Sequence, residues 1–235
     1  IRKLVQRGQI ELLGGGFYEP IPALIPPVDF YGQVAKHKDF LSKHFKVAAR
    51  GFWLPERIWE PSLPTLLKPT GLEYTVLDDN HFALTQAAPD NWFGHYITED
   101  NGNPLYIFPI NKDLRYLVPF KPPEETIAFL AAIADESGNR AAVLADDAEK
   151  FGLWPGTEHS VSKGGWLDKF FTLLEENART ISTRTFSEYL DEHDPVGRIY
   201  LPSASYAEMQ VWQPEFRNFL VKYPEANQMH KRMLM

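Results

Sequence analysis

Two short runs of the sequence, Gly51–Pro61 and Leu144–Pro155, each carry an acidic residue directly after an apolar, strand-like stretch. The acidic residues are Glu56 and Asp147, and both runs also contain tryptophan. Carboxylates serve as acid, base or nucleophile when a glycosidic bond is cleaved, and indole rings stack on the apolar faces of sugar rings. The two runs therefore indicate an enzyme that acts on carbohydrate.

Glu56 follows Pro55, which has no amide hydrogen and is expected to end a strand that enters through Gly51–Leu54. This places Glu56 at the C-terminal edge of the strand, where parallel α/β barrels carry their chemistry. The alternative is structural, because Glu56 and Arg57 could form a surface ion pair beside packed tryptophans. The residues alone leave both interpretations open.

Asp146 and Asp147 follow the apolar run 141–144 in the same way. The structural alternative is a helix cap, since Asp accepts hydrogen bonds from free backbone amides. A third interpretation is a hard-cation site that adds Glu149. It ranks lowest because no histidine cluster lies beside these acids, the nearest histidine being His159. We therefore predict no metal site.

The run Gly14–Pro20 comes after a further strand-like segment. Three glycines allow a sharp turn or a close approach to a ligand, and a structural turn is the simpler interpretation. The spacing of a dinucleotide-binding fingerprint is absent, and no cofactor is predicted. Asp78 repeats the pattern of a strand followed by an acid, and a polar loop is the simpler interpretation for it too.

A parallel sheet with crossover helices would bring these acids together, because strand-like segments alternate with helical or loop stretches. The predicted strands are Ile10–Leu13, Arg50–Leu54, Tyr74–Leu77, Leu105–Ile110, Ala141–Leu144 and Ile199–Leu201. The predicted helices are Asp29–Phe45, Glu124–Glu136 and Trp166–Asn177. Strand ends that are far apart in the chain meet at the mouth of a barrel, so Glu56 and Asp147 are expected to converge there.

The predicted strands are fewer than the seven or eight that a closed barrel requires, which indicates an incomplete barrel. From about Ser205 the strand pattern stops, and Glu215–Leu220 and Pro224–Leu234 are predicted as helices. We therefore assign residues 1–205 to a catalytic (β/α) barrel that lacks its first strand. Residues 206–235 are assigned to the start of a helical subregion packed on the barrel.

The composition limits the class of protein. A length of 235 residues with 44% hydrophobic residues is enough for one domain with a sizeable core. The net charge of -7 and the lack of a basic stripe argue against nucleic acid as a partner. The chain has no cysteine, which excludes disulfides, and lacks the apolar run of about 18 residues that a membrane span requires.

The two ends of the chain bear on its location. It opens with Ile1–Arg7, which is neither a methionine start nor a signal peptide, and closes at Met235 in a charged, helix-like stretch. Both ends look cut, so targeting information is expected to lie outside this sequence. On this basis we predict a cytoplasmic protein, and the sequence indicates nothing about its oligomeric state.

Taken together, four runs resemble four of the five signature regions of glycoside hydrolase family 57, in the right order. They are Gly14–Ile21, Gly51–Pro61, Asp146–Thr157 and Asn218–Met233. The chain is most similar to the 4-α-glucanotransferase and α-amylase branch, and Leu201–Tyr206 and Lys222–Glu225 look more like the glucanotransferases. The resemblance implies an α/β fold with a TIM-like (β/α)7 barrel. It also implies an α-1,4-glucan or maltooligosaccharide substrate and a retaining mechanism that requires no metal.

The same resemblance implies roles for individual residues. The family's nucleophile falls on Glu56, and its general acid/base falls on Asp147 rather than Asp146. Glu19, Trp53 and Trp154 match positions that similar proteins use near the sugar-binding subsites.

The sequence departs from the family in two places. The His-Gln-Pro run of the opening strand is absent, and so is the β-rich C-terminal domain of full-length relatives. Two alternatives to glucan transfer therefore stay open, namely an α-amylase that hydrolyses glucan and a truncated, inactive glucan-binding domain. A metal-dependent polysaccharide deacetylase is a weaker rival, because it would need a His/Asp metal triad that the sequence does not reveal.

Overall fold

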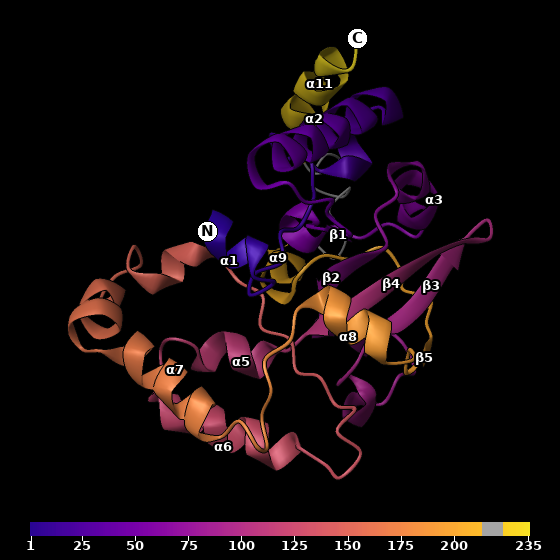
Figure 1. Cartoon of the computed structure of the whole chain (residues 1–235). Helices are drawn as coiled ribbons and strands as arrows, with labels where there is room; N and C mark the ends of the chain where they lie inside the picture. The colour runs from indigo at the N-terminus through magenta and orange to yellow at the C-terminus, as the bar shows by residue number, and fades with distance from the viewer. Residues whose placement is uncertain (213–222) are drawn as a thin grey trace.

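The computed structural model describes residues 1–212 and 223–235, and its centre is a five-stranded sheet with the order β1-β2-β4-β3-β5. Figure 1 shows this sheet with helices around it. The strands are β1 (Gly51–Phe52), β2 (Tyr74–Asp78), β3 (Tyr96–Asp100), β4 (Asn103–Ile110) and β5 (Gly197–Arg198). The predicted helix at Glu215–Leu220 and the first part of the run Asn218–Met233 lie outside the described residues.

The parallel part of the sheet agrees with three of the predicted strands. β1, β2 and β4 run parallel, with Gly51 opposite Tyr74 and Asp78 opposite Ile110. Single bridges extend this series on both sides, since Gly14 pairs with Phe52 and Val143 pairs with Ile110. The predicted strand at 141–144 is thus reduced to the bridge at Val143, and that at 10–13 to a bridge at Gly14, just after its end. β5 lies just before the predicted strand at 199–201.

The β3–β4 hairpin differs from the expected sheet. β3 pairs antiparallel with β4, and the two strands are joined by Asn101 and Gly102. Both residues have positive φ, 50° and 75°, as a tight two-residue hairpin turn requires. The strand β3 was not predicted, and its antiparallel pairing adds to the parallel sheet that was.

Three predicted helices are confirmed as α2 (Pro27–Phe45), α6 (Pro123–Ile133) and α7 (Trp166–Glu176). The helix predicted at Pro224–Leu234 is also confirmed, as α11 (Pro224–Met233). The additional helices are α1 (Arg2–Gln6), α3 (Leu63–Leu67), α4 (Asp79–Ala83), α5 (Lys112–Leu117), α8 (Phe186–Glu192) and α9 (Ala207–Trp212). α11 lies beside α2 (Figure 1), where His230 Nε2 is 2.8 Å from the carbonyl oxygen of Leu24. Within residues 1–212 and 223–235, no helix combines the length and the apolar content that crossing a bilayer requires.

β2 separates the two parts of the apolar core. Every residue of this strand is buried, as expected for a parallel strand that is covered on both faces. Tyr74 and Val76 pack in one cluster with Phe108, whereas Leu77 packs in the other with Phe52. Apolar packing on both faces therefore fixes the position of β2 in the sheet, and with it the position of the residues that follow its C-terminal end.

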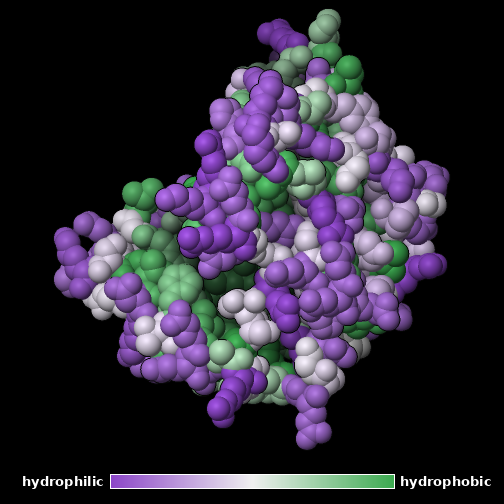
Figure 2. Space-filling model, in the orientation of Figure 1, coloured by the Kyte–Doolittle hydropathy of each residue, from purple (hydrophilic) through white to green (hydrophobic). Residues whose placement is uncertain are grey.

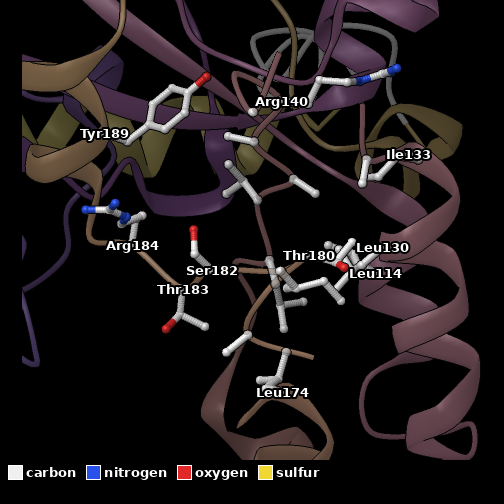
Figure 3. Close-up of a pocket in the computed structure, with 18 of the residues that line it drawn as sticks. Leu114, Leu130, Ile133, Arg140, Leu174, Thr180, Ser182, Thr183, Arg184 and Tyr189 are labelled. Atoms are coloured by element: carbon white, nitrogen blue, oxygen red, sulfur yellow. The ribbon is translucent and has the colours of Figure 1, made fainter. Parts of the chain in front are cut away.

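The sheet does not close among the described residues. A cavity of about 700 Å³ lies between helices α6 and α7, the segment 141–144 and the segment 180–186. Figure 3 shows Leu114, Leu130 and Ile133 on one side of it and Ser182, Thr183 and Arg184 on the other. Apolar side chains also line a hollow between the α6–α7 region and the body of the molecule in Figure 2. The mixed α/β fold with an open parallel series is that of an incomplete barrel.

Candidate active site

The acids singled out in the sequence follow parallel strands at the same edge of the sheet. β1 leads into Pro55 and Glu56, β2 ends at Asp78, and the bridge at Val143 is followed by Asp147. Because these strands are parallel, their carboxyl ends lie on one side of the sheet. The structure therefore gathers the residues after these strands at the C-terminal edge, as the barrel interpretation requires.

Glu56 lies in a strained turn that exposes its side chain. Its φ and ψ are 54° and 14°, and the φ of Arg57 is 46°. Consecutive left-handed residues with large side chains are unusual, and such strain persists only where neighbouring contacts hold it. The carbonyl oxygen of Glu56 accepts a hydrogen bond of 2.8 Å from the Ser205 hydroxyl, and that of Arg57 lies 2.9 Å from His81 Nε2.

Arg57 points away from a pairing with Glu56. Its side chain is buried, and its Nε donates to Asp78 Oδ2 over 3.0 Å. A surface ion pair of Glu56 with Arg57, the structural alternative for this run, is not among the ion pairs of the described residues. The arginine instead anchors the turn that presents Glu56 to solvent.

Tyr206 contacts both Glu56 and Arg57. Burial raises the pKa of the Tyr206 hydroxyl, and its hydrogen bond with the Glu56 carboxylate raises this pKa further. The phenol therefore stays protonated and donates to the carboxylate at neutral pH. The Arg57 guanidinium lies 4.5 Å from the centre of the Tyr206 ring. This contact was missed in the sequence, where Tyr206 stood out only through the segment Leu201–Tyr206.

Asp146 and Asp147 have different environments. The Asp146 side chain is 6% exposed and accepts a hydrogen bond of 2.9 Å from the backbone amide of Asp147. Asp147 is exposed and begins a short 3-10 turn over Ala148–Phe151. Neither side chain makes a capping hydrogen bond to this turn, so the capping alternative is not supported, and the Asp147 side chain is accessible to a ligand.

A continuous row of buried charges connects these two acidic turns, and we call it the ion chain. Its central member, Asp78, accepts from Arg57 at one oxygen and from Arg115 Nη1 at the other, the latter over 2.7 Å. Arg115 Nε is 3.2 Å from Asp146 Oδ2, which also contacts the Lys150 ammonium. All five side chains are at most 12% exposed. Buried charges require such partners, because each would otherwise lose its hydration without compensation.

Both ends of the ion chain also contact tryptophan. Arg57 lies 5.7 Å from the ring centre of Trp53, and Lys150 lies 5.4 Å from that of Trp154. Phe120 stacks on Trp154 with ring centres 6.0 Å apart. Cation–π and stacking contacts at these distances hold an indole in place. Trp154 is still 40% exposed, so a ring face is available for a sugar.

A cavity of about 520 Å³ lies beside Glu56 and is lined by residues 13–19, His37, Trp53 and Pro55. It brings together Glu19 and Trp53, two of the residues assigned to substrate binding. Glu19 is exposed and has a φ of 51°. Glu56, Asp147 and Trp154 do not themselves line this cavity, and none of the five assigned residues lines the larger cavity beside α6 and α7.

The glycines of the Gly14–Pro20 run have a structural role. A side chain at Gly16 would meet Pro20 Cδ at 2.5 Å, and one at Gly14 would lie 3.3 Å from the carbonyl oxygen of Gly51. The tight spaces at both positions are therefore set by the protein's own chain, in agreement with the interpretation of this run as a turn.

Several site residues were missed in the sequence. Asp78 had been interpreted as part of a polar loop, but it is buried between two arginines. Arg115 and Lys150 lie in short helical turns whose sequences give no sign of burial. Among residues 1–212 and 223–235, no group of three or more His, Asp and Glu side chains could hold a metal ion.

Comparison with known proteins places these features in a family. The profile of glycosyl hydrolase family 57 matches residues 1–202. An alpha-amylase of Pyrococcus horikoshii is 41% identical over 266 aligned residues, and so is a 4-alpha-glucanotransferase of Thermococcus litoralis. Both alignments cover 100% of this chain, but only 42% and 40% of the respective relatives.

The fold agrees with the sequence comparison. The crystal structure of 4-alpha-glucanotransferase from Thermococcus litoralis superposes with a TM-score of 0.94 at 40% identity, over 100% of this chain and 41% of that one. The chain therefore spans about two fifths of the length of the relatives that it matches.

Proposed function

The chain belongs to glycosyl hydrolase family 57, and on that premise we propose that it forms the catalytic part of a retaining 4-α-glucanotransferase that acts on α-1,4-glucans. The observation that carries the proposal is the pair of exposed carboxylates, Glu56 and Asp147, each following a strand at one sheet edge beside tryptophan. The names of the similar proteins, 4-alpha-glucanotransferase and alpha-amylase, support the substrate class.

In the first step, Glu56 would act as the nucleophile. Its carboxylate attacks the anomeric carbon while Asp147 donates a proton to the departing glycosidic oxygen, so that the C–O bond breaks and a glucosyl ester of Glu56 forms. Retaining enzymes place the two carboxyl groups about 5–5.5 Å apart for this purpose. Exposure of Glu56 in its strained turn supports this role because the nucleophile must meet the sugar directly.

In the second step, Asp147 would act as a base. It removes the proton from the 4-hydroxyl of a second glucan, whose oxygen attacks the anomeric carbon and releases Glu56. Two inversions at the same carbon retain its configuration. If water takes the place of the 4-hydroxyl, the same residues carry out the hydrolysis of an α-amylase.

The sugar rings would bind between aromatic and acidic side chains. Trp53 lines the cavity beside Glu56, and the partly exposed Trp154 lies past Asp147, so both offer indole faces to apolar sugar surfaces. Glu19 would accept hydrogen bonds from sugar hydroxyl groups. An uncharged glucan is compatible with the net charge of -7, which disfavours nucleic acid.

The proposed division of the chain assigns residues 1–205 to the catalytic barrel and residues 206–235 to the start of a helical region. The contact of Tyr206 with Glu56, and the 2.6 Å hydrogen bond from the Tyr116 hydroxyl to Glu208, support packing of α9 against the site. A cytoplasmic location stays a prediction from the sequence.

The test is to assay Glu56→Gln and Asp147→Asn in the complete protein on maltooligosaccharides. Both variants are expected to lose at least about 100-fold in turnover, since nucleophile and proton donor are each essential to the first step. Asp113→Asn, which removes an exposed carboxylate on α5, serves as the matched control and is expected to keep full activity.

The products decide between the candidate functions. Longer and shorter oligosaccharides from a single maltooligosaccharide indicate transfer, whereas glucose and maltose alone indicate hydrolysis. Retention on a glucan column without turnover would indicate a binding domain. Near-normal turnover by Glu56→Gln or Asp147→Asn would contradict the assigned roles.

A further inference from the structure

We propose that the ion chain is a positioning device for the catalytic pair and the two tryptophans, with Asp78 and Arg115 as its positioning residues. The inference rests on the proposed function, because it assigns these residues a role toward Glu56 and Asp147. The ion chain would explain how the two turns that carry Glu56 and Asp147, which come from distant parts of the chain, are held at a fixed distance and orientation.

At one end, the ion chain controls the turn that carries Glu56. Arg57 follows Glu56 directly, and both residues are left-handed. The Arg57 side chain is fixed by its bond of 3.0 Å to Asp78, while His81 contacts the Arg57 carbonyl oxygen and, over 3.0 Å, that of Asp78. Asp78 therefore holds both the side chain and, through His81, the backbone of the residue next to Glu56.

At the other end, the ion chain controls the turn that carries Asp147. Asp146 precedes Asp147 and accepts its backbone amide, while its second oxygen faces Arg115 and Lys150. Lys150 also donates to the carbonyl oxygen of Arg115 over 2.8 Å. A shift of Arg115 would therefore move Asp146 and, with it, the backbone of Asp147.

The centre of the ion chain couples the two ends. One oxygen of Asp78 accepts from Arg57 and the other accepts from Arg115. The Arg115 guanidinium in turn donates to both Asp78 and Asp146. When Asp78 is neutralised, Arg57 loses its ionic partner while Arg115 keeps Asp146, and the connection between the ends is weakened. The terminal cations lie on the rings of Trp53 and Trp154, so the same connection sets the two aromatic surfaces.

The first experiment compares Asp78→Asn with the control Arg50→Met in the complete protein, on maltooligosaccharides. Arg50 bonds Glu73 and Asp191 outside the site. A misplacement of about 1 Å in a catalytic constellation costs on the order of 100-fold in rate, so Asp78→Asn is expected to lower kcat by about that factor. Its KM should rise by less than about 10-fold, because Trp53 and Trp154 shift but keep the cations beside them. Arg50→Met should change neither constant by more than about 2-fold.

A second variant separates positioning from stability. Asp78→Asn leaves buried cations with too few anions and is expected to lower Tm. The paired variant Asp78→Asn with Arg115→Gln removes one charge of each sign and should regain much of that Tm. If the ion chain positions the catalytic pair, kcat stays low when Tm recovers. If kcat returns toward the wild-type value together with Tm, the ion chain only stabilises the fold and the proposal is overturned.

A third measurement does not depend on activity. In protein labelled with 5-fluorotryptophan, the ¹⁹F resonances of Trp53 and Trp154 can be assigned with Trp53→Phe and Trp154→Phe. Both resonances are expected to shift or broaden in Asp78→Asn and in the paired variant, and neither in Arg50→Met. Unchanged resonances in Asp78→Asn would overturn the proposal. A wild-type protein without transfer or hydrolysis would refute the proposed function, while these resonances would still decide the positioning.

Discussion

Two arginines lie at opposite ends of the parallel strands, and each donates hydrogen bonds to two carboxylates. They differ in how deeply they are buried. Arg50, just before β1, donates to both oxygens of Glu73 and of Asp191 at 2.8 to 3.0 Å. Arg115, after β4, donates to Asp78 and Asp146 at 2.7 and 3.2 Å. The Arg50 side chain is 30% exposed with acids at 44% and 62%, whereas that of Arg115 is 12% exposed with both of these acids at 6%. A third acid, Glu208, lies farther from Arg115, at 3.9 Å, and is 45% exposed.

Burial, rather than the number of hydrogen bonds, decides what each arginine does. Around Arg50 water can replace any lost bond, so these ion pairs join surface elements at low cost. Around Arg115 no such replacement exists, and the position of each charge depends on its neighbour. The comparison thus teaches that the exposed ion pairs around Arg50 add little to the fold, whereas the buried ion pairs around Arg115 depend on one another for both stability and position.

The largest expected effect is on stability. Arg115→Met should lower the free energy of unfolding by about 3–5 kcal/mol, because it leaves buried carboxylates short of a partner. Arg50→Met should lower it by about 0.2–1 kcal/mol, because its acids become hydrated. Methionine keeps an apolar stem in both variants, so the difference reports the charge. Equilibrium urea unfolding measures both values, and equal losses would break the comparison.

His95 extends the comparison to a buried ionisable side chain that has no hydrogen-bond partner in the described part of the chain. His95 is 1% exposed, packs against Phe108 with ring centres 5.3 Å apart, and neither ring nitrogen has a partner among the described residues. Burial lowers the pKa of His95, and the charge of His193 lowers it further. Below the unfolded-state pKa of about 6.5, His95 therefore binds a proton in the unfolded chain but not in the folded protein. The free energy of unfolding consequently decreases as the pH is lowered through this range.

His95→Phe should remove this part of the pH dependence. The loss of stability between pH 7.5 and pH 5.5 is expected to become smaller in the variant by at most about 1.4 kcal/mol per pH unit. Burial also lowers the pKa of His81, which is unchanged in the variant, so part of the slope remains. Urea unfolding at the two pH values measures the effect. An identical slope in wild type and variant would show that His95 can take up a proton in the folded state.

The smallest expected effect is the change that salt makes in the stability differences between wild type and the arginine variants. At about 1 M ionic strength, charges on the surface are screened within about 3 Å, whereas buried pairs are screened much less. The stability difference between wild type and Arg50→Met should therefore approach zero in 1 M NaCl, while that for Arg115→Met stays nearly constant. Unfolding curves at 0.05 M and 1 M NaCl test this. A strong salt dependence of the Arg115→Met difference would mean that water reaches the ion chain.

Strands and helices whose ends are marked by proline or acidic residues could be predicted from the sequence. The strand that leads to Glu56 was indicated by Pro55, and the start of α6 by prolines followed by acidic residues. The β3–β4 hairpin also had a local signal, Asn101-Gly102, but it was missed because no strand was predicted before it. The apolar run of β4 was correctly predicted as a strand, and it runs parallel to β2.

The ion chain could not have been predicted from local patterns. Three of its bonded pairs join residues 21, 37 and 31 positions apart, and Asp146 and Lys150 alone are near neighbours, four positions apart. Each of these residues by itself is typical of a solvated surface. Only the parallel register, with Asp78 opposite Ile110, brings the end of β2 next to α5, which carries Arg115. Non-local pairing thus determined which charges became buried, and why Asp78 is not the loop residue it was expected to be.

The most direct test of the central claim is to identify the residue that bonds to sugar. The complete protein is incubated with 5-fluoro-α-glucosyl fluoride, which slows release of a covalent intermediate, and its peptides are analysed by mass spectrometry. The account predicts a fluoroglucosyl adduct on the peptide that contains Glu56, and no adduct in Glu56→Gln. An adduct on another carboxylate, or products of inverted configuration without any adduct, would contradict it.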